Sequence, residues 1–455
     1  MNFSMEKILI AGANIVNEGK IFEGSVLISN NRIEEIIPVG SNNLFLEDYE
    51  NVELIDGRGK FLLPGVIDDQ VHFRDPGLTQ KGDLYTEAKA AVAGGVTSFM
   101  DMPNTDPKAI TLNILEEKYK LASQKSLANY SFFLGATNSN IEEIEKANPA
   151  RICGVKVFLG ASTGNMLVDD PAVLEDIFLK SRMIVAIHSE DEGVIRKNLA
   201  IFKEKYGEQI PFEAHPLIRS EEACYKSTEM AVKLAKKHNT RLHILHLSTV
   251  KELDLLDNSK PLKEKKITAE VCVHHLWFDD RDYSRLGSLI KWNPAIKTEK
   301  DKNGLFKGLL EDKIDIIATD HAPHLKEEKS LPYLSCPSGG PLIQHSLVIM
   351  LEFYHRKRIS LEKVVEKMCH APAVLYRIKD RGFIRKGFFA DLVLVDLKAP
   401  WVVSKGNLLY KCGWSPFEGT KFSSTVTHTF VNGNLVYRNG NFNEQHKGNR
   451  LEFNA

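Results

Sequence analysis

The middle of the chain alternates short apolar runs with helix-like stretches, and this alternation restricts the fold more than any other feature. Runs rich in Val, Ile and Leu are typical of buried strands, and amphipathic stretches such as residues 84–93 and 221–237 lie between them. Such alternation predicts a parallel sheet with crossover helices. Eight candidate strands occur, at residues 65–69, 96–101, 130–133, 154–159, 183–188, 242–247, 267–273 and 314–319. Eight such units predict an α/β fold of the (β/α)8 TIM-barrel type.

Both ends of the chain carry short β-rich runs separated by turn signals. The runs lie at residues 7–10 and 25–28 near one end and at 390–396 and 427–437 near the other. Asn30-Asn31 and Asn432-Gly433 are turn signals, the second of the hairpin kind. We predict that the two ends pair into a small β-sandwich domain, residues 1–62 and 385–455, with the barrel at 63–384 inserted between them. Two separate β flaps are the alternative.

Charge and cysteine usage exclude several classes of function. The 455 residues carry a formal net charge of −1, which indicates no nucleic-acid or membrane-surface partner. No run of about 18 apolar residues exists, and the N-terminus lacks the pattern of a signal peptide. The six cysteines are scattered without a C-x-x-C pair, which is typical of reduced thiols. We therefore expect a cytoplasmic protein without nucleic-acid or membrane partners.

Polar side chains follow the predicted strands, at the end where barrels of this type carry their active sites. His72 and Arg74 are two residues apart, so they point to the same side of an extended segment. Imidazole is a good metal ligand, and a guanidinium is a planar fork for carboxylates. The other candidates are Gln70, Asn104, Lys156, His188, His246, His274, His275, Asp320 and His324. A lone histidine at a strand end is usually structural, but so many at one face favour a site.

Lys156 is the most informative of these residues. It lies between two valines in a predicted buried strand, where a charged lysine is costly. The structural interpretation is an ion pair with Asp320 or another acid. The functional interpretation is that the neutral amine captures CO₂ and becomes a carbamate. A carbamate spreads one negative charge over two oxygens, so it can bridge two cations.

A carboxylated Lys156 predicts a centre of one or two zinc ions. His188 and His246 would complete the more exposed site, and His72 and Asp320 the more buried one. Nitrogen and oxygen ligands without thiolate suit zinc and leave a position for water. Bound zinc pulls the pKa of that water toward neutrality. Asp320 would take a proton from the water and pass it to a leaving nitrogen.

Several motifs along nearly the whole chain carry a family resemblance. They lie at residues 65–77, 101–105, 154–158, 186–190, 243–248, 274–276, 291–294 and 318–324. His-Phe-Arg, Pro-Asn-Thr and Asp-His-Ala-Pro-His are the most specific. Together they resemble the cyclic amidohydrolases, specifically dihydroorotases of the bacterial class I type. The resemblance implies reversible closure of N-carbamoyl-L-aspartate to dihydroorotate in pyrimidine biosynthesis.

The resemblance also implies a set of substrate contacts. These fall on Arg74, Asn104, Asn293, His324 and the backbone of Ser338 and Gly339. The open form of the substrate is a small dianion, and Arg74 can bind a carboxylate with two hydrogen bonds. As structural alternatives, Arg74 could pair with Asp75 or Asp68, Asn104 could cap the next helix, and His324 could be a surface residue. The charged run at 326–329 is interpreted as a solvated part of a loop over the site.

Gln70 departs from the family motif, which has His-x-His where this chain has Gln70-Val71-His72. A carboxamide oxygen is a poorer zinc ligand than imidazole, so the buried site is predicted to be weaker or rebuilt. The departure also supports a rival of another class, a noncatalytic partner of aspartate transcarbamoylase. Retention of the other ligands favours an active enzyme.

A second rival is a hydantoinase, dihydropyrimidinase or allantoinase, which shares the metal site but need not bind a ring carboxylate. The presence of both Arg74 and Asn104 favours the dihydroorotase interpretation. A homodimer is expected, and aspartate transcarbamoylase is a candidate partner.

Overall fold

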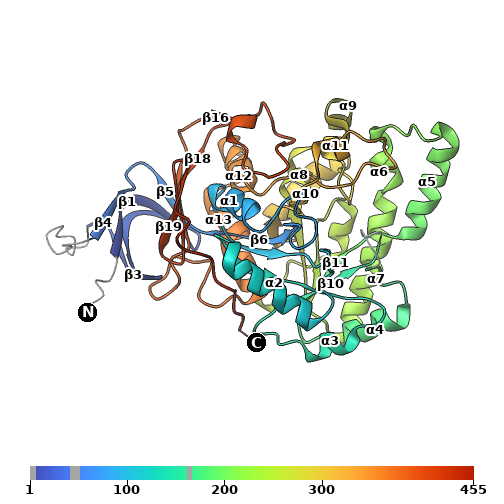
Figure 1. Ribbon diagram of the computed structural model, residues 1–455, viewed down its shortest axis with the longest axis horizontal. Coiled ribbons are helices and arrows are strands. Elements are labelled where there is room, and N and C mark those ends of the chain that lie inside the picture. Colours follow the sequence, from blue (N-terminus) through green and yellow to red (C-terminus); the bar gives the residue numbers. More distant parts are fainter. Residues whose placement is uncertain (1–6, 41–51, 161–165, 455) are drawn as a thin grey trace.

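Eight parallel strands form a barrel at the centre of the computed structural model, which describes residues 7–40, 52–160 and 166–454 (Figure 1). In chain order they are β6 (Val66–Val71), β7 (Val96–Asp101), β8 (Asn129–Phe132) continued by β9 (Leu134–Gly135), β10 (Val155–Phe158), β11 (Val185–His188), β12 (Leu242–Ile244), β13 (Ile267–Cys272) and β14 (Ile316–Ala318). Each of the eight predicted runs overlaps one of these strands, so the predicted barrel is confirmed.

Backbone pairing closes the barrel. β8 pairs with β7 and β9 pairs with β10, so the third strand bends between its two neighbours. The first and last strands meet through a parallel bridge between Val71 and His321. The backbone N–H of His72 donates to the carbonyl of His321 at 2.7 Å. The carboxyl ends of all the strands therefore face one mouth.

Helices follow the strands, and the longer ones cover the outside of the barrel, while short ones such as α11 (Lys326–Lys329) lie at its mouth (Figure 1). They are α1 (Thr86–Ala93), α2 (Leu112–Lys125), α3 (Ile141–Lys146), α4 (Pro171–Lys180), α5 (Glu192–Tyr206), α6 (His215–Ile218), α7 (Glu221–His238), α8 (Val273–Trp277), α9 (Tyr283–Leu286), α10 (Glu299–Leu310), α11 (Lys326–Lys329), α12 (Ser346–His355), α13 (Leu361–Val365) and α14 (Ala371–Tyr376). α7 begins after Ser220, whose side chain accepts from the backbone N–H of Ala223, and ends at Asn239, where φ is +54°. Among the described residues, no helix combines the length and apolar character needed to cross a membrane.

Strands from both chain ends form one nine-stranded sheet beside the barrel (Figure 1). They are β1 (Lys7–Asn17), β2 (Lys20–Ser29), β3 (Arg32–Pro38), β4 (Val52–Asp56), β5 (Phe61–Pro64), β15 (Leu392–Asp396), β18 (Thr425–Val431), β19 (Asn434–Arg438) and β20 (Asn441–Phe442). A separate pair consists of β16 (Trp401–Val402) and β17 (Lys421–Phe422).

Pairing of β5 explains how the two ends join. β5 pairs parallel with β1 and antiparallel with β15, so the sheet runs without a break from the N-terminal to the C-terminal strands. The sequence predicts a small β-sandwich domain built from both chain ends, and hydrogen bonding runs continuously through all nine of its strands. Asn432 and Gly433 form the turn between β18 and β19 with φ of +51° and +78°, as a primed hairpin turn requires. The predicted boundary at residues 62 and 63 lies within β5, and the one at 384 and 385 precedes β15.

The first barrel strand, β6, is buried along its whole length although half of its residues are polar. The Thr319 hydroxyl donates to Asp68 at 2.6 Å, and the Tyr376 hydroxyl donates to Asp69 at 2.7 Å. Burial raises the pKa of Asp68 to about 8. These bonds fix the strand that carries His72 and Arg74 against the end of β14 and against α14.

Candidate active site and metal centre

One cavity of about 110 Å³ lies at the carboxyl ends of the strands. It is lined by the twelve residues that the sequence analysis assigns to metal binding, proton transfer or substrate binding: Gln70, His72, Arg74, Asn104, Lys156, His188, His246, Asn293, Asp320, His324, Ser338 and Gly339. Phe158 and Ala322 complete the lining. The sequence reasoning missed Phe158, although its spacing of two from Lys156 on one strand signals the same orientation. The barrel thus brings the predicted residues together, while their chemical roles remain predictions.

His188 and His246 face each other in this cavity. His188 Nδ1 lies 3.0 Å from His246 Nε2. His188 ends β11, and His246 follows β12 at a φ of +40°, which turns its side chain inward. Two imidazole nitrogens bound to one tetrahedral zinc, with bonds of about 2.05 Å, would be about 3.3 Å apart. The pair therefore has nearly the spacing that two ligands of a single ion would have.

Glu190 fixes which nitrogen of His188 is available. His188 Nε2 lies 2.9 Å from a carboxylate oxygen of Glu190, so Nε2 carries the proton and Nδ1 keeps its lone pair. Arg219 donates to Glu190 at 3.0 Å. Burial opposes the charge on Glu190, but Arg219 and His188 hold the pKa of this carboxyl below its usual value. A carboxylate behind a ligating histidine is the usual support of a metal site. Glu190 and Arg219 were not selected from the sequence.

The electrostatics of the two histidines suit a metal. Burial lowers the pKa of His188 despite the neighbouring Glu190, and it lowers the pKa of His246 well below the ordinary value. Both imidazoles are therefore neutral near pH 7, as metal ligands must be. His246 Nδ1 is buried without a hydrogen-bond partner among the described residues.

Lys156 lies in β10 with only 1% of its surface exposed. Its Nζ lies 4.6 Å from the centre of the Phe158 ring, and no ion pair with a carboxylate is found for it among the described residues. The structural alternative, a direct ion pair with Asp320, is therefore not observed. Burial lowers the pKa of Lys156 to about 7, against the opposing charges of Asp320, Glu270 and Asp69. A large fraction of the amine is thus uncharged at neutral pH.

Asp320 is the carboxylate of the cavity. It follows β14 at a φ of +49°. Its Oδ1 lies 3.1 Å from His72 Nε2 and accepts a hydrogen bond from Gln70 Nε2 at 3.3 Å. The other ring nitrogen of His72, Nδ1, lies 2.7 Å from Asn104 Oδ1. Asn104 therefore does not cap the next helix, and Thr111 caps α2 instead.

Arg74 and His324 lie on the other side of the cavity. Arg74 Nη2 lies 3.0 Å from His324 Nε2, and Arg74 Nε donates to the Pro323 carbonyl at 3.1 Å. Asp75 pairs with Lys125 and Asp68 accepts from Thr319, so an ion pair of Arg74 with either acid is not observed among the described residues. Burial lowers the pKa of Arg74 to about 10, so the guanidinium stays charged at neutral pH. In the part of the chain that the structure describes, no ion pair with a carboxylate is found for Arg74, so its charge is available to an anion in the cavity.

A loop carrying Ser338 and Gly339 covers the cavity. Lys329 donates to the carbonyls of Pro337 and Gly339, both at 2.9 Å. A Cβ at Gly339, where φ is +124°, would lie 2.7 Å from the carbonyl oxygen of Ala322, so only glycine fits. The sequence interpretation of residues 326–329 as solvated is wrong for Lys329, which is buried in α11. Its side chain holds the loop through backbone carbonyls, a role that charge patterning does not reveal.

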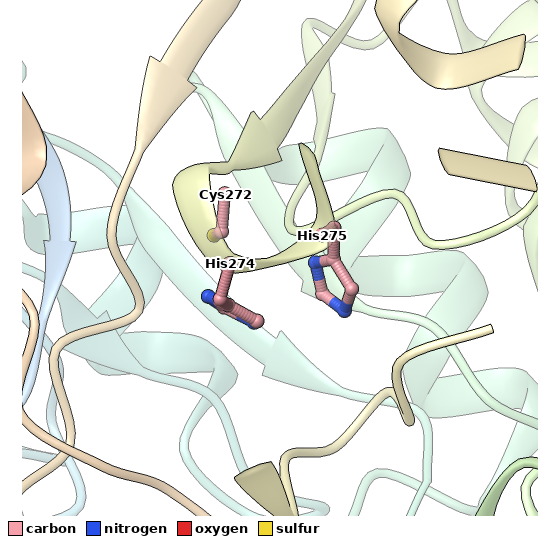
Figure 2. A group of neighbouring side chains, drawn as sticks. All are labelled: Cys272, His274 and His275. Atoms are coloured by element: carbon pink, nitrogen blue, oxygen red, sulfur yellow. The ribbon is translucent and has the colours of Figure 1, made fainter. Parts of the chain in front are cut away.

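Two further groups of potential ligands lie outside the cavity lining. Cys272, His274 and His275 are buried at the end of β13, and their potential ligand atoms lie within 4.8 Å of one another (Figure 2). His274 stacks on Trp292, with ring centres 4.4 Å apart, and His275 Nε2 lies 3.2 Å from the Pro294 carbonyl. These contacts give the two histidines, which the sequence placed at the strand end, a packing role.

The second group consists of Asp69, His243 and Glu270 below the cavity. Burial alone would lower the pKa of His243, but its bonds with Asp69 and Glu270 raise it to about 9. His243 is therefore protonated at neutral pH, and it supplies the positive charge beside these two carboxyl groups.

Comparison with known families gives one match that covers most of the chain. The model of the Amidohydrolase family matches residues 61–436. This range begins in β5 and includes every barrel strand and every residue of the cavity lining.

Curated relatives match over nearly their full lengths. The dihydroorotase of Pyrococcus furiosus is 31% identical, with 95% of each chain covered. The dihydroorotase of Carboxydothermus hydrogenoformans is 32% identical over 95% of this chain and 98% of the relative. The dihydroorotase of Methanothermobacter thermautotrophicus is 33% identical over 85% of this chain and 86% of the relative.

Solved structures share the fold. An L-hydantoinase (dihydropyrimidinase) from Arthrobacter aurescens superposes with a TM-score of 0.90 at 26% identity, covering 97% of this chain and 98% of that one. A dihydropyrimidinase from Brevibacillus agri superposes with a TM-score of 0.84 at 23% identity and 96% coverage of both chains, which shows the fold alone.

Proposed function

Because the chain belongs to the amidohydrolase family, we propose that it is a dihydroorotase, which closes N-carbamoyl-L-aspartate reversibly to dihydroorotate and water in pyrimidine biosynthesis. One observation supports this substrate most strongly. The buried, charged Arg74 lies beside His324 in the same cavity as the facing nitrogens of His188 and His246. A carboxylate-binding cation next to a metal-ligand pair suits a cyclic amide that carries a carboxylate.

The donors at His188 and His246 fit a zinc ion, because two neutral imidazole nitrogens converge at ligand spacing. Lys156 would provide the third ligand after its neutral amine adds to CO₂, which forms an N–C bond and releases one proton. The resulting carbamate supplies an anionic oxygen in place of a buried amine. When bound, zinc supplies Lewis acidity, which makes water nucleophilic near pH 7 and polarises the amide carbonyl.

Asp320 would move the proton. Hydrolysis of dihydroorotate breaks the amide bond between a ring nitrogen and its carbonyl carbon, adding hydroxyl to the carbon and hydrogen to the nitrogen. Asp320 accepts the proton of the attacking water and delivers it to the leaving nitrogen, so the carboxylate is regenerated in each cycle. The reverse direction uses the same proton path.

Arg74, Asn104 and His324 would orient the substrate by its carboxylate. Asn293 Oδ1 is buried without a hydrogen-bond partner among the described residues, and it is an acceptor for a ring N–H. The backbone at Ser338 and Gly339 closes over the ring. Holding both ends of a small ring in this way aligns the reacting carbonyl with the metal ligands.

Hydantoinase and dihydropyrimidinase activities are the alternatives, since proteins with those names share the fold. The substrates of those enzymes need not carry a ring carboxylate, so these activities would leave the buried cation of Arg74 without a role. A noncatalytic role with aspartate transcarbamoylase leaves the paired metal ligands unexplained. Homodimer formation, binding to a transcarbamoylase and a cytoplasmic location remain predictions.

A comparison of substrates tests the proposal. With zinc-loaded protein, kcat/KM for dihydroorotate should exceed that for hydantoin and allantoin by at least about 100-fold, because those rings leave Arg74 unpaired. Spectrophotometric assays on one preparation give the ratio. Preferential turnover of hydantoin would favour the alternative, and turnover of none of the three would favour the noncatalytic role.

Replacing Arg74 with lysine should raise KM for carbamoyl-aspartate about 10- to 100-fold and change kcat less, because a point charge cannot reproduce the planar fork. Steady-state kinetics measure the two constants separately. Arg381→Lys is a matched control, because Arg381 is similarly buried but pairs with Asp391 outside the cavity. An unchanged KM in Arg74→Lys would remove Arg74 from the substrate site.

A further inference from the structure

Gln70 lies on the side of the cavity where a second metal ion would bind, at the position where the family motif has a histidine. The groups on that side are Gln70, His72 and Asp320, all of which line the cavity. On the opposite side, His188 Nδ1 and His246 Nε2 face each other at 3.0 Å, with Lys156 in the same cavity. The two sides therefore differ in chemistry at one position, Gln70.

The carboxamide of Gln70 is oriented by partners at both of its ends. Nε2 lies 3.3 Å from Asp320 Oδ1, and a carboxylate oxygen can only accept, so the amide N–H donates to it. Oε1 lies 3.7 Å from the sulfur of Cys272, whose S–H donates to it. The oxygen, the only atom of this side chain that could bind a hard cation, is thus directed to the end of β13. An amide N–H group has no lone pair for a metal.

Two side chains contact the carboxylate of Asp320. Both contacts, from Gln70 Nε2 at 3.3 Å and from His72 Nε2 at 3.1 Å, go to the same oxygen, Oδ1. Among the described residues no hydrogen bond to the other oxygen, Oδ2, is found, which leaves this oxygen for proton transfer. With the Gln70 oxygen turned away, His72, Asp320 and a carbamate oxygen at Lys156 are the donors this side can offer. That set is one imidazole short of the His-x-His motif, so the side favours a hydrogen-bonded carboxylate over a second zinc ion.

We propose that this chain binds one catalytic metal ion per subunit, at Lys156, His188 and His246, and that Gln70 replaces a second ion as the group that positions Asp320. Gln70 is a positioning residue, since it acts through Asp320. The inference rests on the proposed function for the role of Asp320, but the metal count does not depend on any substrate.

Zinc counting on three proteins tests the count. Each is purified, passed over a weak chelating resin and analysed for zinc per chain. The wild type should hold one equivalent, Gln70→His should hold two, and His188→Ala should hold none. Two equivalents in the wild type, one in Gln70→His, or one retained in His188→Ala would each overturn the single-ion account. These readings are independent of turnover, so they stand even if dihydroorotate is not the substrate.

Gln70→Leu tests the positioning role, because leucine has a similar size and removes the amide donor. It should keep one equivalent of zinc and an unchanged KM, while kcat falls about 10- to 100-fold, as expected for loss of an outer partner. Loss of zinc would identify Gln70 as a ligand, and an unchanged kcat would show that it does not position Asp320. If this variant does not fold, the wild-type and Gln70→His counts still decide the proposal.

Discussion

Replacing Lys156 with alanine is expected to lower kcat for dihydroorotate roughly 1,000-fold or more and to reduce bound zinc. Loss of a residue that hydrogen-bonds to a metal ligand typically lowers metal affinity or activity about 10- to 100-fold. Loss of a ligand itself should lower them more. Lys156 is buried, has a pKa lowered to about 7, and shows no ion pair among the described residues. Its structural contribution as a charged group is therefore small, and its removal should affect chemistry more than folding.

Partial rescue by short carboxylic acids would identify the missing group. Acetate or propionate can enter the space left by the side chain and supply the oxygen ligand that the carbamate provided. Lys367→Met is a control, because Lys367 is equally buried but binds Asp312 and a backbone carbonyl away from the cavity. Wild-type turnover in Lys156→Ala would refute the carbamate ligand.

Replacing Asp320 with asparagine is expected to lower kcat about 100- to 10,000-fold in both directions, the range of general acid–base catalysis. The amide has nearly the same shape and can still accept from Gln70, but it cannot take a proton from water. Equal losses in ring opening and ring closure are expected, because one proton path serves both. Rates measured from dihydroorotate and from carbamoyl-aspartate would show this.

Asp301→Asn is the matched control for this substitution. Asp301 has the same exposed fraction as Asp320, 7%, and lies in the capping box of α10. Its substitution should affect stability through the helix cap and leave kcat unchanged. Near-wild-type turnover by Asp320→Asn in either direction would remove Asp320 from proton transfer.

The barrel could be predicted because two independent signals agree at most of the strands, an apolar run and polar residues within it or at its end. The predicted ends of the strands were less accurate where the backbone turns out of a strand. The predicted run at 242–247 extends past β12, which ends at Ile244, because the backbone leaves the strand to place His246 at positive φ. The single sheet formed by the two ends depends on β5 pairing with strands from both ends, and local periodicity carries no information on pairing.

The cavity residues were predicted from residue type and position, but the partners that orient them were not. Glu190 and Arg219 follow no spacing rule that separates them from ordinary surface charges. Lys329 belongs to a charged run that is typically solvated, yet the structure buries it against carbonyls. For Gln70, the sequence showed a weaker ligand, and only the contacts with Asp320 and Cys272 show where its oxygen points.

Turnover of dihydroorotate by metal-depleted and zinc-reconstituted protein measures the central claim most directly. The metal-depleted protein should be inactive, and the same protein should hydrolyse dihydroorotate once zinc is restored. Equal turnover with and without metal would contradict the account, as would the absence of turnover in both samples.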